Sequence, residues 1–194
     1  MRHPDSSPFP PRRRGPAKSF LSISIVGSGS TCCHHESLYY RDHAAWPKDR
    51  SALFTRWKNG YWFAHRACHS TARAFYGDVY DIPAALGRFD VVIVGAILEH
   101  LSDQIRALAS ISRVAEKTIV INTGVLKTDE PIAHFMGDSA KPQIDYVFWL
   151  YSVGVYRHVL RMLGFEIVRT EDASFLFNDL NQWAGRTAIV AERT

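Results

Sequence analysis

Residues 89–101 have the sequence FDVVIVGAILEHL, and this stretch decides the fold class. Its run of β-branched residues from Phe89 to Val94 is typical of a strand that is buried on both faces. A helical pattern follows, with Ser102 as the expected N-cap and a stripe formed by Ile105, Leu108, Ala109 and Ser112. A buried strand followed by an amphipathic helix indicates a parallel sheet, because parallel neighbours need a long crossover connection.

The alternation of strands and helices continues on both sides of this stretch. The hydrophobic pattern, which includes Trp57 and Tyr61, predicts a helix at 51–74, and it predicts a second helix at 155–163 that ends at Gly164. The last predicted strand runs antiparallel to the one before it. Predicted strands occupy residues 20–26, 73–76, 118–121, 165–170 and 186–192. The fold class is therefore α/β, with a mostly parallel sheet and a terminal antiparallel strand.

Composition indicates one soluble globular domain behind an irregular N-terminal tail. The chain has 194 residues, of which 46% are hydrophobic and 22% charged. Residues 1–18 hold five of the nine prolines and five of the 23 Lys and Arg residues, but only one of the 19 acidic residues. We therefore expect a disordered tail and an atypical linker over residues 1–36, and a folded domain over residues 37–194.

The same numbers limit the partners and the cellular compartment. Once residues 1–18 are set aside, basic and acidic residues balance at 18 each, so we do not expect the folded part to bind nucleic acid. No apolar run reaches the ~18 residues that span a bilayer. The short apolar run after the arginines of the tail is a poor export signal. Three cysteines cannot form a disulfide framework, so we expect a cytoplasmic protein that is not bound to a membrane.

Residues 32–36, with the sequence CCHHE, concentrate side chains that zinc prefers. Adjacent ligands rarely converge on one tetrahedral ion, and no second Cys/His pair with conventional spacing follows. We therefore predict no metal site and read this segment as a polar linker. The aromatic stretches at 57–63 and 146–156 either form an acceptor pocket or pack in the core, and core packing is the commoner fate.

The ordered set of motifs resembles the class I S-adenosylmethionine-dependent methyltransferases. The matching parts are YGDVYDIP at 76–83, FDVVIVGAILEHL at 89–101, the strand at 118–121 and the Leu163-Gly164-Phe165 joint before the final strand pair. The resemblance covers most of residues 37–192. It implies a Rossmann-like, doubly wound domain that transfers a methyl group from S-adenosylmethionine to an unidentified, small-molecule or other acceptor.

The resemblance also assigns residues to the site, beyond the carboxyl ends of the strands. Asp78 would accept a hydrogen bond from the adenine amino group, with the Val79 backbone flanking the ring, and Gly95 and Ala96 would line the methionine portion. Alternatively, Asp78 only satisfies loop backbone donors. His100 would be the general base on the acceptor, unless alignment of the reacting atoms suffices, as it does in many methyltransferases.

The first part of the family pattern is incomplete in this chain. The candidate for the glycine-rich turn is Val26-Gly27-Ser28-Gly29-Ser30, with Ile25 where the family has an acidic residue. Too few residues follow to hold a crossover helix and a second strand. Two hypotheses follow. The chain is either an enzyme that binds the cofactor despite its atypical first strand and turn, or a catalytically inactive interaction module. Loss of strands would expose apolar surface of the sheet and would favour an oligomer. A nicotinamide-dependent oxidoreductase is a more remote reading, because the GxGxxG fingerprint is missing.

Overall fold

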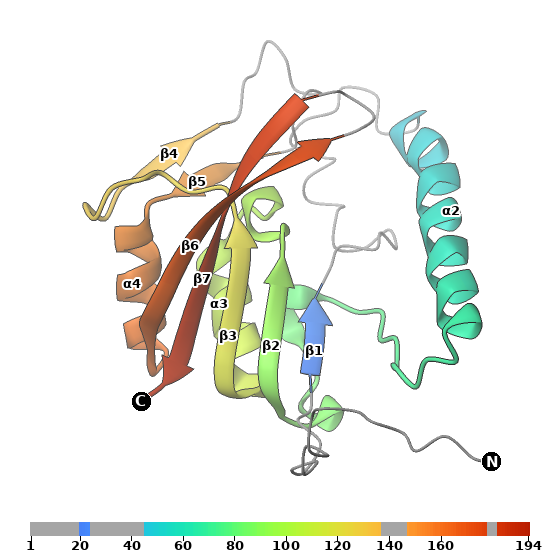
Figure 1. Cartoon of the computed structure of the whole chain (residues 1–194), viewed down its shortest axis with the longest axis horizontal. Helices are drawn as coiled ribbons and strands as arrows, with labels where there is room; N and C mark the ends of the chain where they lie inside the picture. The colour runs from blue at the N-terminus through green and yellow to red at the C-terminus, as the bar shows by residue number, and fades with distance from the viewer. Residues whose placement is uncertain (1–19, 24–44, 137–146, 178–181) are drawn as a thin grey trace, which may run out of the picture.

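The computed structural model describes residues 20–23, 45–136, 147–177 and 182–194. They form a five-stranded sheet in the order β1-β2-β3-β7-β6 (Figure 1). The central strands are β2 (Phe89–Gly95) and β3 (Ala115–Thr123), which pair in parallel. β1 (Phe20–Ile23) pairs in parallel with β2.

A long hairpin completes the sheet on its other side. β6 (Phe165–Phe177) and β7 (Gln182–Arg193) are antiparallel, and β7 is also antiparallel to β3. Four strands therefore run in one direction and β7 runs against them. This arrangement confirms the predicted α/β class with a mostly parallel sheet and a terminal antiparallel strand. β1 comes from the segment assigned to the linker, and the domain boundary itself stays a prediction, because residues 24–44 lie outside the described part of the chain.

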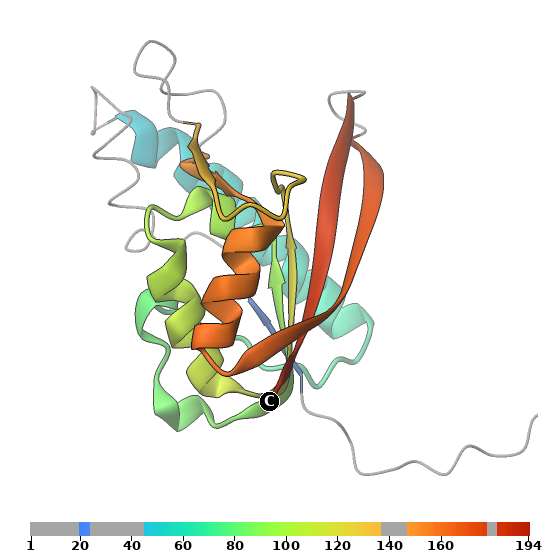
Figure 2. The same cartoon turned by 90° about the vertical axis from the view of Figure 1, so that its left-hand side faces the viewer.

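Two helices cover the same face of the sheet (Figure 2). They are α3 (Gln104–Val114) and α4 (Val153–Met162). Alternate residues of three strands pack beneath them: Val92, Val94, Ile119, Ile121, Ile189 and Ala191, all fully buried. Such alternation follows from the two-residue period of a strand. A two-stranded sheet of β4 (Ala133–Phe135) and β5 (Trp149–Tyr151) lies beyond the carboxyl ends of the main strands.

Helix α2 (Ala45–Ala67) departs most from the sequence prediction. It starts before residue 51 and ends well before residue 74. His69 takes a left-handed conformation (φ 48°), and Ser70 N donates to His65 O at 2.9 Å. This hydrogen bond belongs to a motif that terminates helices. Phe63 is 70% exposed, so the described aromatic residues of the 57–63 stretch do not pack in a core.

Three further predictions need correction. Residues 73–76 form an exposed loop rather than a strand, and they pair with no strand of the described structure. Asp103, not Ser102, caps α3, because its carboxylate accepts from Arg106 N at 2.9 Å. The predicted stripe of α3 is correct only in part: Leu108 and Ser112 are buried, but Ile105 is 48% exposed. Gln104 and Ile111, which the stripe did not include, are fully buried.

The 3₁₀ helices connect these elements at the positions where the sequence predicted loops. η1 (Val79–Asp81) and η2 (Ala84–Leu86) precede β2, and η3 (Leu98–His100) follows it. Within the described residues, no helix is long and apolar enough to cross a membrane.

Candidate functional site

The predicted site residues Gly95 and Ala96 form the turn at the carboxyl end of β2. Ala96 has a φ of 49°, which is uncommon for any residue except glycine. Its backbone N–H donates to Asn122 O at 2.7 Å, on the neighbouring strand β3. Backbone held in such a sparsely populated conformation costs about 1 to 3 kcal/mol and is concentrated at functional sites.

His100 ends η3, four residues after this turn. It is half-buried, and its backbone N–H donates to Ile97 O at 3.0 Å. The structure thus brings three of the five predicted residues, Gly95, Ala96 and His100, to one end of the sheet.

Asp78 is the N-cap of η1, and Val79 is the first residue of this 3₁₀ helix. Asp78 is exposed, and its Oδ1 accepts from Tyr80 N at 2.8 Å, the local backbone contact named as the alternative to a ligand role. The Val79 side chain is buried in the core. Tyr80 Oη accepts from Asp103 N at 3.4 Å, which places η1 against the start of α3. No contact among the described residues joins Asp78 to the Gly95–Ala96 turn.

A buried polar cluster lies beside the turn, and the sequence prediction did not include it. Glu99 is 3% exposed, and its Oε2 accepts from Thr123 Oγ1 at 2.5 Å. Arg186 of β7 places Nη2 3.7 Å from Glu99 Oε1. Thr123 ends β3 and Glu99 lies on η3 after β2, and this position near the carboxyl ends of two strands was a usable signal in the sequence. Arg186 carried no such signal, because only the tertiary fold brings β7 to this end of β3.

Tyr156 and Gln104 extend the polar cluster into the core. Tyr156 Oη donates to Gln104 Oε1 at 2.9 Å, and Gln104 Nε2 donates to Trp149 O at 2.9 Å. Burial raises the pKa of the Tyr156 phenol far above its ordinary value, and the nearby Glu99 charge raises it further, while a hydrogen bond from Thr123 opposes the shift. Tyr156 is therefore a protonated donor that holds α4 to α3.

A cavity of about 420 Å³ lies between the loop after β3, the start of α4 and the hairpin. Its walls are mainly polar, and their charged side chains are paired: Lys127 Nζ is 2.8 Å from Asp172 Oδ2, and Arg157 Nη2 is 2.9 Å from Asp129 Oδ1. The hydrogen bond from Lys127 is the main reason why the pKa of Asp172 lies below its ordinary value. None of the predicted site residues lines this cavity.

No group of three or more His, Cys, Asp or Glu side chains within the described ranges could hold a metal ion. Residues 32–36 fall outside those ranges, so the sequence-based reading of that segment stays a prediction.

Comparison with solved structures finds proteins that are similar to part of this chain. One is the magnesium protoporphyrin IX methyltransferase ChlM from Synechocystis PCC 6803 with bound SAM, at 16% identity and a TM-score of 0.45, covering 64% of this chain and 48% of that chain. Another is the YcgJ protein from Bacillus subtilis, at 10% identity and a TM-score of 0.49, covering 68% of this chain and 75% of that chain. The alignment with ChlM thus spans about half of that protein.

Comparison with protein families gives a match over part of the chain. No curated protein matches the chain. Residues 61–118 match the family described as "Methyltransferase domain", and this segment includes η1, β2, η3 and α3. The segment from Tyr61 to Thr118 is therefore similar in sequence to a methyltransferase domain, and it contains the motifs at 76–83 and 89–101 that carry the resemblance.

Proposed function

We propose that this chain binds S-adenosylmethionine beyond the carboxyl end of β2 and transfers its methyl group to an acceptor. The observation that carries the proposal is the Gly95–Ala96 turn, a strained backbone segment inside the stretch that matches a methyltransferase domain. When bound, the cofactor supplies an activated methyl group on a sulfonium. The protein then chiefly supplies orientation.

The residues of the turn fit a ligand that approaches the backbone closely. Gly95 has no side chain, and its neighbour Asn122 fixes Ala96 through the 2.7 Å hydrogen bond. The methionine portion of the cofactor would lie along this turn. A ligand that packs here would contact backbone held at the end of a buried strand, and such backbone loses little entropy on binding.

The Asp78 carboxylate can accept a further hydrogen bond, from the adenine amino group. Its carboxylate accepts one hydrogen bond, from Tyr80 N, whereas an ionised carboxylate has about four acceptor positions. The side chain is exposed, so a ligand can reach it. We therefore assign adenine recognition to Asp78 and the backbone of Val79, and we assign a general-base role to His100, which lies at the same end of the sheet as the turn.

Isothermal titration with S-adenosylhomocysteine tests the cofactor site. We expect the folded wild-type chain to bind with a micromolar dissociation constant, and Asp78→Asn to bind about tenfold more weakly. Asparagine keeps an oxygen for Tyr80 N, so this variant separates ligand binding from capping of η1. Asp81→Ala is the matched control, because Asp81 lies on the same 3₁₀ helix and pairs with Arg113.

Two results would overturn the proposal. One is a folded wild-type chain that binds neither S-adenosylhomocysteine nor S-adenosylmethionine at millimolar concentration; this result would favour a non-catalytic interaction module. The other is equal affinity of the wild type and Asp78→Asn, which would remove Asp78 from the site.

A further inference from the structure

The Glu99 carboxylate has one oxygen without a hydrogen bond. Oε2 accepts from Thr123 Oγ1, but Oε1 is buried and has no hydrogen-bond partner among the described residues. Roughly nine in ten buried polar atoms in proteins are hydrogen-bonded, so an exception needs an explanation. An acceptor atom that the protein leaves unsatisfied can be satisfied by a ligand.

Arg186 limits which ligand groups fit this position. Its Nη2 lies 3.7 Å from Glu99 Oε1, beyond hydrogen-bond distance, and its side chain is 27% exposed. A group that joins the two must donate a hydrogen to the carboxylate and accept one from the guanidinium. A hydroxyl does both with one oxygen. A carboxylate only accepts, and an aliphatic amine is protonated at neutral pH and only donates.

Glu99 and the Gly95–Ala96 turn are hydrogen-bonded to consecutive residues of β3. Asn122 O accepts from Ala96 N, and Thr123 Oγ1 donates to Glu99. The register of the sheet places Gly95 opposite Asn122. The unsatisfied Glu99 oxygen therefore belongs to the same end of the sheet as the turn.

We infer that Glu99 and Arg186 recognise a hydroxyl group of the methyl acceptor, so that this chain methylates oxygen. The inference rests on the proposed function. As the acceptor oxygen bonds to the methyl carbon, the bond from that carbon to the sulfonium sulfur breaks and its electron pair stays on sulfur. When the acceptor is a hydroxyl, its proton passes to Glu99 Oε1, which then takes the general-base role in place of His100. Arg186 stabilises the negative charge that develops on the acceptor oxygen.

Binding of small aromatic probes tests the recognition step without catalysis. Saturation-transfer NMR is measured on the chain loaded with S-adenosylhomocysteine, with phenol as the hydroxyl probe and benzoate and benzylamine as the anionic and cationic probes. We expect phenol to bind in preference to both. Glu99→Gln keeps the side-chain volume and an oxygen for Thr123, and it should weaken phenol binding at least tenfold while the affinity for S-adenosylhomocysteine changes less than twofold.

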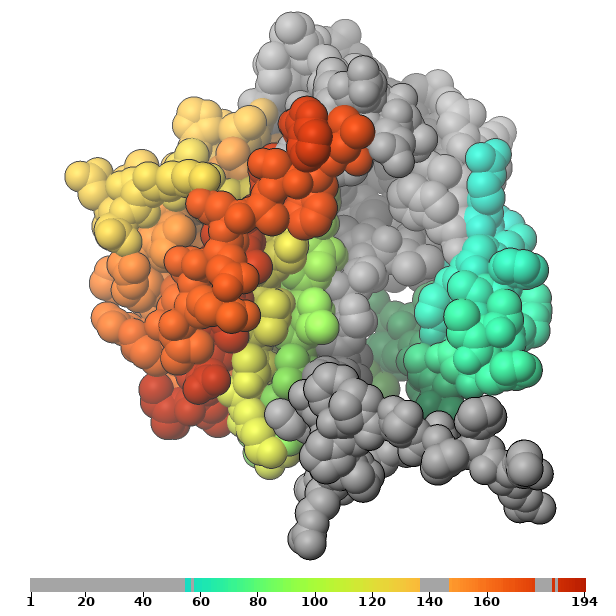
Figure 3. Space-filling model, in the orientation of Figure 1, coloured from blue at the N-terminus to red at the C-terminus, as the bar shows by residue number. Residues whose placement is uncertain are grey.

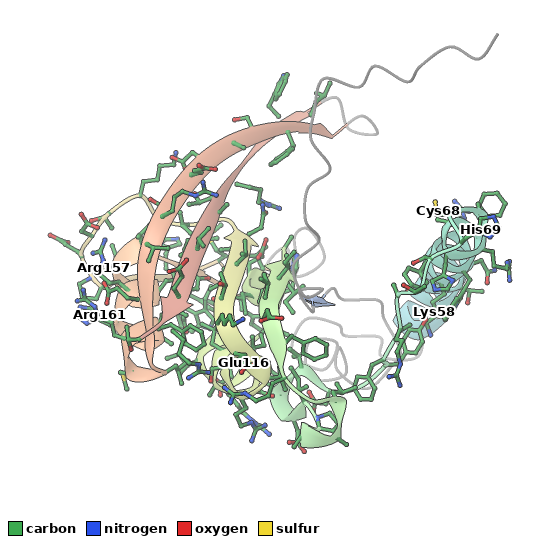
Figure 4. All side chains as sticks on the ribbon, turned by 60° about the horizontal axis from the view of Figure 1, so that its bottom comes forward. Lys58, Cys68, His69, Glu116, Arg157 and Arg161 are labelled. Atoms are coloured by element: carbon green, nitrogen blue, oxygen red, sulfur yellow. The ribbon has the colours of Figure 1, made fainter. Side chains whose placement is uncertain are left out.

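Arg186→Met should also weaken phenol binding at least tenfold. Because Arg186 is less buried than Glu99, this variant provides the test if Glu99→Gln does not fold. Glu116→Gln is the matched control, because Glu116 is an exposed glutamate near the start of β3 (Figure 4). This control should bind phenol as the wild type does.

Product analysis gives the second readout. With S-adenosylmethionine and phenol, the wild type should form anisole, and Glu99→Gln should form it at least tenfold more slowly. The inference is wrong if the loaded wild type does not bind phenol, if it prefers benzylamine or benzoate, or if Glu99→Gln binds phenol equally well. Failure of the proposed function is distinct, because the wild type would then not bind S-adenosylhomocysteine at all.

Discussion

Gly154 occupies the second position of α4, where the neighbouring chain leaves no space for a side chain. A Cβ atom there would collide with the Asp129 carbonyl oxygen and lie 2.7 Å from its carbon. These are backbone atoms, so they cannot move aside as a flexible side chain would. We expect Gly154→Ala to lower the free energy of unfolding by about 1 to 3 kcal/mol. Urea denaturation measures this loss.

Gly185 provides the matched control for Gly154. A Cβ atom at Gly185 would meet nothing within 4 Å. Gly185→Ala should therefore change the free energy of unfolding by less than about 0.5 kcal/mol. Equal effects of the two substitutions would contradict the close packing of α4 against the loop at Asp129.

The Tyr156 hydroxyl gives the molecule a specific dependence on alkaline pH. Burial and the Glu99 charge raise its pKa in the folded state above 10, the value expected for an exposed tyrosine. Below pH 10 both states keep the proton, so the contribution of Tyr156 to stability is constant. Above pH 10 only the unfolded state loses it, and stability falls by about 1.4 kcal/mol per pH unit.

Tyr156→Phe separates this contribution from those of other groups. Denaturation at a series of pH values should show a less steep alkaline decline in the variant than in the wild type. At neutral pH, the variant should lose about 1 to 3 kcal/mol, because Gln104 Oε1 then lacks its donor. Parallel curves for the two proteins above pH 10 would exclude a protonated, buried Tyr156.

At the scale of elements, the start of α3 shows how a cap is selected. Asp103 accepts from Arg106 N, whereas Ser102, one residue earlier, is exposed and lies outside the cap. Asp103→Ala should therefore lower stability by about 1 kcal/mol, and Ser102→Ala should have almost no effect. Thermal unfolding of both variants gives the comparison. A larger loss of stability in Ser102→Ala than in Asp103→Ala would show that Ser102 is the N-cap, as the sequence predicted.

The same helix shows why the sequence predicts elements better than their details. The strands at 89–94 and 118–121 and the joint at Gly164 depend on local patterns, so the sequence predicts them. Ser102 and Asp103 are both good caps, and packing of fully buried Gln104 in the core decides which residue begins the helix. Local patterns contain no such information.

The sequence likewise predicts some residues of the candidate site and misses others. Gly95, Ala96 and His100 come from one local motif, and the structure brings them together. The Glu99–Arg186 pair depends on the position of β7 beside β3. Strand-like residues 73–76 have no partner strand among the described elements, and without a partner their β-propensity does not produce a strand.

At the scale of the whole molecule, the outer part of the hairpin and α2 stand apart from the core. The described outer part of the hairpin extends past the other strands (Figure 1), and it lies at the surface (Figure 3). Trp183 is 71% exposed and Phe175 is 51% exposed. Lys58 on α2, and Cys68 and His69 directly after this helix, lie away from the sheet (Figure 4). β3, in contrast, is hydrogen-bonded on both edges and covered by α3.

This distribution of contacts predicts unequal resistance to opening. Amides of α2 and of the hairpin beyond Asp172 should exchange with deuterium through local fluctuations, because few buried contacts hold these segments. Amides of Ile119 and Ile121 should exchange slowest, because both residues are fully buried in β3 and exposing them requires loss of the core.

Native-state exchange in increasing, sub-denaturing concentrations of urea distinguishes amides that exchange by local fluctuation from amides that exchange by unfolding of the core. Exchange of β3 should accelerate steeply with urea, and exchange of α2 should hardly change, since local opening exposes little new surface. Equal protection and an equal urea dependence across α2 and β3 would instead show that the helix unfolds together with the sheet.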